Sequence, residues 1–188
     1  MESKSKNPSS MRSRKLITES LIKLMMIKPY SEITITEIAN NAEVVRRTFY
    51  RNYKSKEEVI EYYLLNLVKG LALEFIKIED VNPYNISIVY FNYMSKYSSF
   101  FQILDENNLF TLLLDVGENF IPKLNKTSKK DLGDEFDEQF LDYYHAFNVS
   151  GMWFVLMRWI RKGMVESPEE LALIYDKILK VNLYNKSK

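Results

Sequence analysis

The sequence predicts an all-α protein in which a head of three short helices precedes a larger helical bundle, with about nine helices in total. Its 188 residues include only five glycines and five prolines, which favours long helices over a turn-rich sheet. Apolar residues recur every three or four positions, and several segments begin with residues that cap helices. With 46% apolar residues, the chain can bury a substantial core.

The first helix is predicted from Arg12 to Lys28, where apolar residues share one helical face and the Lys28-Pro29 pair ends the pattern. Residues 1–11 are polar and have nothing to bury, so we expect a flexible tail there. A second helix is expected after Thr34, because Thr34 and Glu37 have the spacing of a capping box.

A short turn then leads to a third helix at about Val45–Asn52. Three short helices need one another to bury their apolar faces, so residues 12–57 are expected to form one domain of helix-turn-helix type. Residues 58–188 are expected to form a second, helical domain.

The remaining helices follow from the same spacing. A fourth helix is predicted from Ser55 to about Ile78, and the Lys126–Gly133 stretch is the most loop-like internal segment. The last helix has a clear start, with Ser167 as N-cap, Pro168 at the first helical position and two glutamates after it. The later helices are predicted at 84–96, 98–105, 107–125, 134–161 and 168–184.

Charge is unevenly distributed along the chain. The first 60 residues carry 12 Lys and Arg against 7 Asp and Glu, although the net charge of the whole chain is only +1. A basic segment attracts polyanions, and an ordinary solvated surface accounts for a surplus of this size equally well.

Two motifs in the basic end carry a resemblance to a known family. The run Thr34-Ile-Thr-Glu-Ile-Ala-Asn-Asn-Ala42, followed by Thr48-Phe-Tyr-Arg-Asn-Tyr-Lys-Ser-Lys56, resembles the head of the TetR family of bacterial regulators. The match covers about residues 12–60, and the closing pattern Trp159-Ile-Arg-Lys-Gly-Met164 with Ser-Pro-Glu-Glu-Leu171 also looks like the end of many members. The resemblance implies a sequence-specific DNA-binding transcriptional regulator, expected to be a repressor that a small-molecule effector releases.

The family pattern can be transferred to individual residues of this chain. Tyr50 and Lys56 match positions that grip phosphates, and Thr48 is a further expected phosphate contact. Arg46, Arg47 and Asn52 match positions where the family reads bases or adjacent phosphates, and arginine can bind guanine with two parallel hydrogen bonds. The residues expected at double-stranded DNA are Val45, Arg46, Arg47, Thr48, Tyr50, Asn52 and Lys56. A solvated face of a short helix would account for the arginines without DNA.

Two residues depart from the family pattern. Glu43 stands where members usually have glycine in the turn, and Val45 stands where Ser or Thr usually begins the recognition helix. Each change is expected to cost on the order of 1 kcal/mol, because glycine tolerates positive φ and serine caps a helix. The alternative function is therefore a regulator that binds DNA weakly and acts through a partner protein.

The second domain is rich in aromatic residues, which more often form ordinary core than a ligand site. Family members enclose an effector cavity there, so the resemblance implies a pocket for a small apolar or aromatic effector. The expected pocket residues are Phe91, Met94, Phe110, Leu113, Phe140, Tyr144 and Phe147.

A palindromic operator requires two heads related by two-fold symmetry, so we expect a homodimer. The resemblance points to the last two helices as the interface, where apolar stripes are wide enough to serve a partner as well as the chain's own core. The alternative is that both stripes are used inside one subunit. The expected interface residues are Trp153, Leu156, Met157, Ile160, Leu171, Ile174 and Ile178.

Several other classes of protein are disfavoured. The chain has no cysteine and one histidine, His145, so a metal site is not expected. The acidic residues between 131 and 138 lack the spacing of a calcium loop. No catalytic or cofactor motif is present, and no apolar run approaches the ~20 residues of a membrane helix. We expect a cytoplasmic protein that is not an enzyme, requires no cofactor and does not bind membranes.

Overall fold

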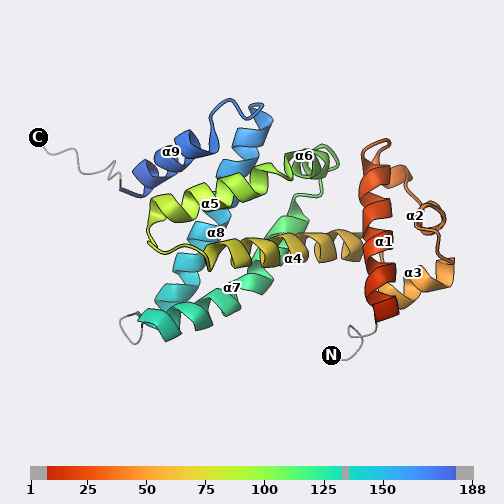
Figure 1. Ribbon diagram of the computed structural model, residues 1–188, viewed down its shortest axis with the longest axis horizontal. Helices are drawn as coiled ribbons and strands as arrows, with labels where there is room; N and C mark the ends of the chain where they lie inside the picture. The colour runs from red at the N-terminus through yellow and green to blue at the C-terminus, as the bar shows by residue number, and fades with distance from the viewer. Residues whose placement is uncertain (1–7, 133–135, 181–188) are drawn as a thin grey trace, which may run out of the picture. The chain divides into compact units, whose positions relative to one another are not determined.

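The computed structural model describes residues 8–132 and 136–180, which form nine α-helices, one 3-10 helix and no strand (Figure 1). The prediction of an all-α fold with about nine helices is confirmed for this part of the chain. The elements are α1 (Pro8–Met25), η1 (Tyr30–Glu32), α2 (Ile35–Asn41), α3 (Arg46–Asn52), α4 (Lys56–Phe75), α5 (Pro83–Ser95), α6 (Ser98–Glu106), α7 (Thr111–Leu132), α8 (Glu138–Arg161) and α9 (Pro168–Lys180).

These elements divide into two compact units. The first unit contains the described residues up to Asn66 together with Ile103–Pro122, and the second contains Leu67–Gln102 with the described residues from Lys123 onward. The helix-turn-helix head lies entirely in the first unit, which also includes the end of α6 and the first half of α7.

The head is built around a small apolar core shared by three helices. Helices α2 and α3, with seven residues each, are too short to be stable alone in water, so burial of one face against α1 and each other is what keeps them helical. The side chains at the centre of this core are almost completely buried, and they are Ile17, Leu21, Ile38, Ala39, Phe49 and Tyr53.

The capping box predicted at the start of α2 is confirmed. The Glu37 amide donates to Thr34 Oγ1 at 3.2 Å, and the Thr34 amide donates to Glu37 Oε2 at 2.8 Å. Lys28 forms an ion pair with the same carboxylate. Because Lys28 and the Thr34 groups hydrogen-bond to the carboxylate, they lower the pKa of Glu37 to about 2.

The first helix begins earlier than its apolar spacing predicts. It starts at Pro8 instead of Arg12, so residues 8–11 are helical and not part of a tail. Contacts with α3 explain the extra turn, since Ser10 Oγ donates to Asn52 Oδ1 at 2.8 Å. Residues 1–7 of the predicted tail lie outside the described residues.

In the second unit, α5 packs along α9 and the core is aromatic. Phe91 is fully buried, and its ring lies 6.1 Å from Trp159 and 6.2 Å from Tyr175. Trp153 fills the same core against Tyr90 and Phe101. Edge-to-face ring contacts therefore link α5 to α8 and α9 in this core.

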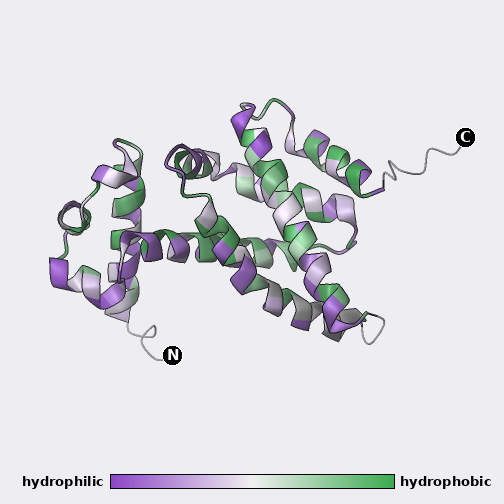
Figure 2. Ribbon diagram, turned by 180° about the vertical axis from the view of Figure 1, so that it is seen from behind, coloured by the Kyte–Doolittle hydropathy of each residue, from purple (hydrophilic) through white to green (hydrophobic). Residues whose placement is uncertain are grey.

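The start of α9 agrees with its sequence signals. The Glu170 amide donates to Ser167 Oγ at 3.1 Å, and the Ser167 amide donates to Glu170 Oε2 at 2.8 Å, which makes a second capping box. In Figure 2, apolar and polar residues alternate along this helix, as expected for a helix with one buried face.

The prediction of a loop at Lys126–Gly133 was wrong for its described part. Helix α7 continues to Leu132. The stretch is polar, but it contains no Gly or Pro between Pro122 and Leu132, and lysine favours helices. Polarity alone therefore does not end a helix. Gly133 lies outside the described residues.

Among the described residues, no helix is both long enough and apolar enough to cross a membrane.

The capping box predicts a pH-dependent contribution to stability. Glu37 has a folded-state pKa of about 2, below its ordinary value of 4.5, so its contribution is present above pH 4.5 and is lost as the pH falls toward 2. We expect Glu37→Gln to unfold at a lower temperature than the wild type at pH 7, with a difference that shrinks between pH 4.5 and pH 2. Thermal unfolding of both proteins across this range tests the prediction; a difference that is constant with pH would contradict it.

Candidate nucleic-acid interface

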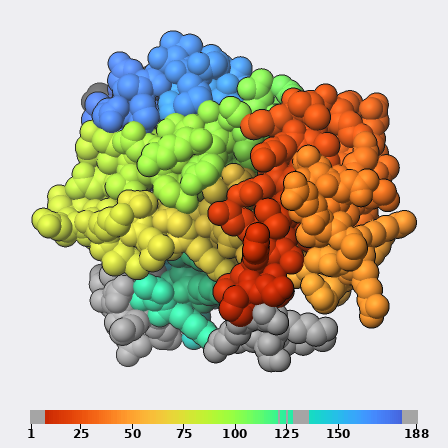
Figure 3. All heavy atoms as spheres, turned by 45° about the vertical axis from the view of Figure 1, so that its right-hand side comes forward, coloured from red at the N-terminus to blue at the C-terminus, as the bar shows by residue number. Residues whose placement is uncertain are grey.

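Helix α3 has one buried and one exposed face, and the two faces differ sharply in chemistry. Phe49 is 0% exposed, because it packs into the head core. The exposed side chains are three arginines and a tyrosine, and the helix contains no acidic residue. In Figure 3, α1 in red and the α2–α3 segment in orange form one continuous surface of the head. The basic face of α3, defined here as Arg46, Arg47, Tyr50 and Arg51, suits a polyanion.

Arg46 and Tyr50 form a pair on this face. Arg46 Nη2 donates to the Tyr50 hydroxyl at 3.2 Å, and the guanidinium carbon lies 5.5 Å from the centre of the ring. The Tyr50 ring also stands edge-on against Phe49, with 5.6 Å between centroids. These contacts restrict the rotamers of both side chains, which lowers the entropy lost when they bind a ligand.

Asn52 is not on this face, although the family resemblance placed it at DNA. Its side chain is buried, and Nδ2 donates to the Thr48 carbonyl at 2.8 Å while Oδ1 accepts from Ser10. Its backbone carbonyl accepts from Arg14 Nη2 at 3.1 Å. Asn52 therefore joins α3 to α1 and is unavailable for a base contact.

The side chain of Lys56 is partly used by hydrogen bonds within the protein. Its Nζ donates to the carbonyls of Tyr30 and Ile33, at 2.9 and 2.7 Å, and it lies 4.2 Å from the centre of the Tyr30 ring. An ammonium group has three N–H donors, so these bonds leave one for a phosphate. The phosphate contact implied by the resemblance remains a prediction for this residue.

The turn between α2 and α3 keeps a geometry that normally requires glycine. Glu43 has φ of 53°, in the left-handed region. The Val44 amide donates to the Ala39 carbonyl at 2.9 Å, and the Glu43 amide donates to the Asn40 carbonyl at 3.0 Å, as in a Schellman motif. The expected strain is therefore present, while the shape of the turn is retained.

Val45 is the N-cap of α3 and provides no side-chain hydrogen bond to it. The side chain is 70% exposed beside the basic face, and Thr48 is partly buried one turn later. The start of α3 thus has no side-chain cap, as its sequence predicts, and presents an apolar group.

Arg14 is a residue of the head that sequence reasoning missed. Its guanidinium contacts two rings, 5.1 Å from the centre of Tyr53 and 4.9 Å from that of Tyr62, and the rings contact each other edge-to-face at 5.8 Å. These contacts join α1 and α4 to the end of α3. No local pattern marks them, because the three residues are distant in sequence. Arg51 also belongs to the basic face, and its i, i+4 spacing from Arg47 was the available signal.

The comparisons with known proteins agree with this geometry. Residues 17–63 match the model for bacterial regulatory proteins of the tetR family, and residues 81–181 match the model for a transcriptional regulator C-terminal region. The chain belongs to the TetR family of transcriptional regulators. Comparison with curated proteins gives no match.

Three solved structures have a similar fold. Lin0861 from Listeria innocua is 18% identical with a TM-score of 0.71, covering 93% of this chain and 92% of that one. The fatty acid degradation regulator FadR from Bacillus halodurans is 17% identical with a TM-score of 0.63, covering 96% and 99%. The dihydroxyacetone kinase operon activator DhaS is 20% identical with a TM-score of 0.55, covering 89% and 92%. At these identities the likeness concerns the fold.

The residues expected to line an effector pocket belong to both units. Phe91 and Met94 are fully buried in the second unit, whereas Phe110 and Leu113 belong to the first. The other three lie on the surface of α8. Phe140, Tyr144 and Phe147, with Asp137, Gln139 and Tyr143, line an open hollow of about 450 Å³. Phe140 stacks on Tyr144 with 5.8 Å between centroids.

The residues expected at the dimer interface also divide into two groups. Trp153, Leu156, Met157 and Ile160 are buried in the core of their own chain, as is Leu171. Ile174 and Ile178 are exposed on α9. The exposed apolar side chains of α8, which include Phe140, Phe147 and Phe154, lie on the opposite side of the helix.

His145 is partly buried, and its burial lowers its pKa below the ordinary value. Its ring stands edge-on to Tyr144 at 5.3 Å. Within the described ranges, no group of three or more His, Cys, Asp or Glu side chains is arranged to hold a metal ion.

Glu43 offers a test of how the turn affects binding. Glu43→Gly removes both the left-handed strain and a negative charge beside the basic face, so we expect it to stabilise the protein by about 1 kcal/mol and to bind DNA more tightly. Glu43→Ala is the matched control, because it removes the charge and keeps the strain. We expect it to bind DNA more tightly without the gain in stability. Chemical unfolding and DNA titrations of both variants separate the effect of the backbone strain from that of the charge. Equal free energies of unfolding for the two variants would contradict the expected strain at position 43.

Proposed function

We propose that this TetR-family regulator binds a palindromic operator in double-stranded DNA as a homodimer and represses transcription until a small apolar or aromatic effector releases it. The observation that carries the proposal is the basic face of α3, where three arginines and Tyr50 are exposed while Phe49 anchors the helix. A major groove accepts a single helix presented in this way.

Within this proposal, the side chains of α3 have separate roles. Arg46 and Arg47 lie at the beginning of the helix, where recognition helices contact base edges. Tyr50 and Lys56 would contact phosphates, together with Thr48 and the backbone at Val45. Residues 12–57 would act as the DNA-binding domain and residues 58–188 as the effector and dimerisation domain. The protein would work in the cytoplasm without enzymatic activity.

We propose that the dimer forms through exposed apolar residues of α8 and α9. The aromatic face of α8, defined as Phe140, Tyr143, Tyr144, Phe147 and Phe154, is exposed in the single chain. Ile174 and Ile178 provide an exposed apolar stripe on α9. Contiguous apolar surface of this kind is typical of an interface, and two-fold symmetry would place two heads on one operator.

A second candidate function is a regulator that acts through a partner protein and binds DNA weakly by itself. The strained, acidic turn at Glu43 and the uncapped start of α3 favour it. A band-shift with the DNA upstream of its own gene distinguishes the two functions. Binding by the purified protein alone supports the operator proposal, and binding only with an added partner supports the second.

Selection of DNA fragments by variant proteins tests the roles on α3. We expect Arg47→Ala to lose ~1 to 3 kcal/mol of preference at particular base pairs, because it removes a base contact. Tyr50→Phe is expected to weaken binding to all sequences about equally, because phosphate contacts are independent of sequence. A selected motif that is unchanged in Arg47→Ala would contradict base reading.

The dimer proposal predicts a change of mass. Phe147→Arg places a charge in the centre of the aromatic face of α8, so we expect the dimer to dissociate at micromolar concentration. Val165→Arg is the matched control, because Val165 is equally exposed and lies outside this face. Light scattering measures both masses. A wild type that is monomeric, or a Phe147→Arg protein that remains dimeric, would contradict the proposed interface.

A further inference from the structure

The chain between α1 and α2 is a short connector that leads directly into the helix-turn-helix. We define the connector as residues 29–33, which include the 3-10 helix η1. It ends at Thr34, the N-cap of α2. The position of α2, and of α3 packed on it, therefore depends on how the connector is held.

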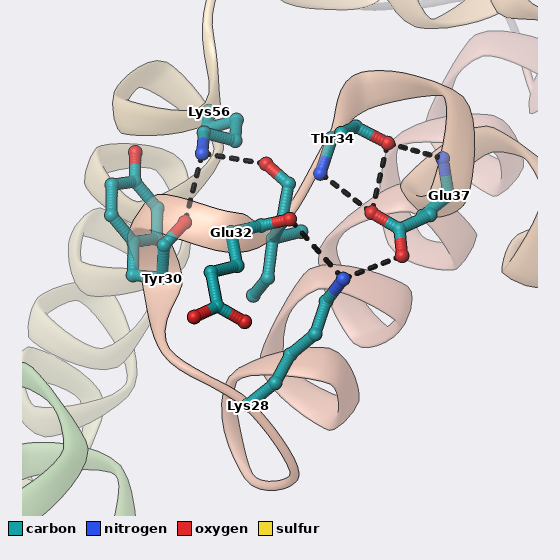
Figure 4. A network of polar contacts seen from close by, with 7 residues as sticks. Lys28, Tyr30, Glu32, Thr34, Glu37 and Lys56 are labelled. Atoms are coloured by element: carbon teal, nitrogen blue, oxygen red, sulfur yellow. Dashed lines mark hydrogen bonds and ion pairs between the residues drawn. The ribbon is translucent and has the colours of Figure 1, made fainter.

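The first turn of α4 holds one side of the connector, as Figure 4 shows for Lys56. Lys56 donates to two carbonyls of the connector, those of Tyr30 and Ile33. The Tyr30 hydroxyl donates to the Glu57 carboxylate next to it. Burial and the nearby carboxylate raise the pKa of Tyr30, so the phenol stays protonated and remains a donor.

A residue from a distant part of the sequence holds the other side. The Tyr30 amide donates to Asn107 Oδ1 at 2.8 Å, across 77 residues of sequence. Asn107 Nδ2 in turn donates to the Ile103 carbonyl at 2.8 Å, which fixes the orientation of the side-chain amide. The N–H at the start of a 3-10 helix has no partner within the helix, so Asn107 supplies one.

The turn that carries Asn107 is itself well defined. It ends α6 with a Schellman motif, in which the Leu109 amide donates to the Leu104 carbonyl at 2.9 Å and Asn108 adopts φ of 56°. Asparagine is one of the few residues other than glycine that tolerates this conformation. A change in the last turn of α6 would therefore displace Asn107 relative to the connector.

We propose that Asn107 is a positioning residue for DNA binding, which orients α2 and α3 by holding the Tyr30 amide. The inference rests on the proposed DNA-binding function and deepens it, because it names a residue distant in sequence from the head that holds the head in position. Hydrogen bonds join Asn107 to Tyr30, and Lys56 to both Tyr30 and Ile33. Ile33 directly precedes Thr34, the N-cap residue of the α2 capping box.

The test compares Asn107→Ala with Asn119→Ala in the full-length protein. Asn119 lies in the same unit and makes the same type of bond, from Nδ2 to the carbonyl four residues earlier, at 2.7 Å. We expect Asn107→Ala to increase hydrogen exchange of the connector amides and to weaken binding to a selected DNA fragment, each by about 2- to 10-fold. Asn119→Ala should change neither. Asn107→Asp keeps the acceptor for the Tyr30 amide and should bind DNA more tightly than Asn107→Ala.

Three results would overturn the positioning role of Asn107. Unchanged exchange in Asn107→Ala shows that Asn107 does not hold the connector and overturns the proposal. Faster exchange with the DNA affinity of Asn119→Ala shows a purely local role and also overturns it. If the wild type binds no DNA, the proposed function fails and the inference falls with it, and the wild-type titration alone identifies that case.

Discussion

The burial of Phe49 and Tyr53 in the head is the constraint on which the rest of the candidate site depends. Helix α3 has seven residues and cannot persist alone, so these two rings keep it folded against α1 and α2. Once this face is buried, the opposite face must be exposed. The chemistry of the exposed face, three arginines and Tyr50, then determines what the helix can bind.

The same core determines which polar residues are unavailable to a ligand. The Tyr53 hydroxyl forms a hydrogen bond with Thr18 Oγ1 at 3.0 Å, and the Arg14 guanidinium lies over the Tyr53 ring. Asn52 lies beside them and joins α3 to α1. Polar residues on and beside α3 thus fall into two groups: some hold the helix in place, and others are exposed at its surface. The structure separates the two roles residue by residue.

Local signals predicted much of this fold. The capping boxes at Thr34 and Ser167 could be predicted because their partners are three residues apart. The buried position of Asn52 and the carbonyl contacts of Lys56 could not, because their partners are 20 or more residues distant. Helix α8 was also difficult to predict from local signals. Apolar residues occur on both of its faces, so their spacing does not indicate which face packs into the chain's own core. Trp153 and Leu156 are buried in the core, whereas the aromatic residues near the start of the helix, from Phe140 to Phe147, are exposed.

The proposed function places α3 against DNA in the working protein. Photocrosslinking measures this contact directly, with a benzophenone amino acid in place of Val45, which is exposed at the start of α3, or in place of Val165, which is exposed in the second unit. The account predicts a crosslink to the selected DNA fragment from position 45 and none from position 165. Equal crosslinking from both positions, or none from position 45 while the protein remains bound, would contradict it.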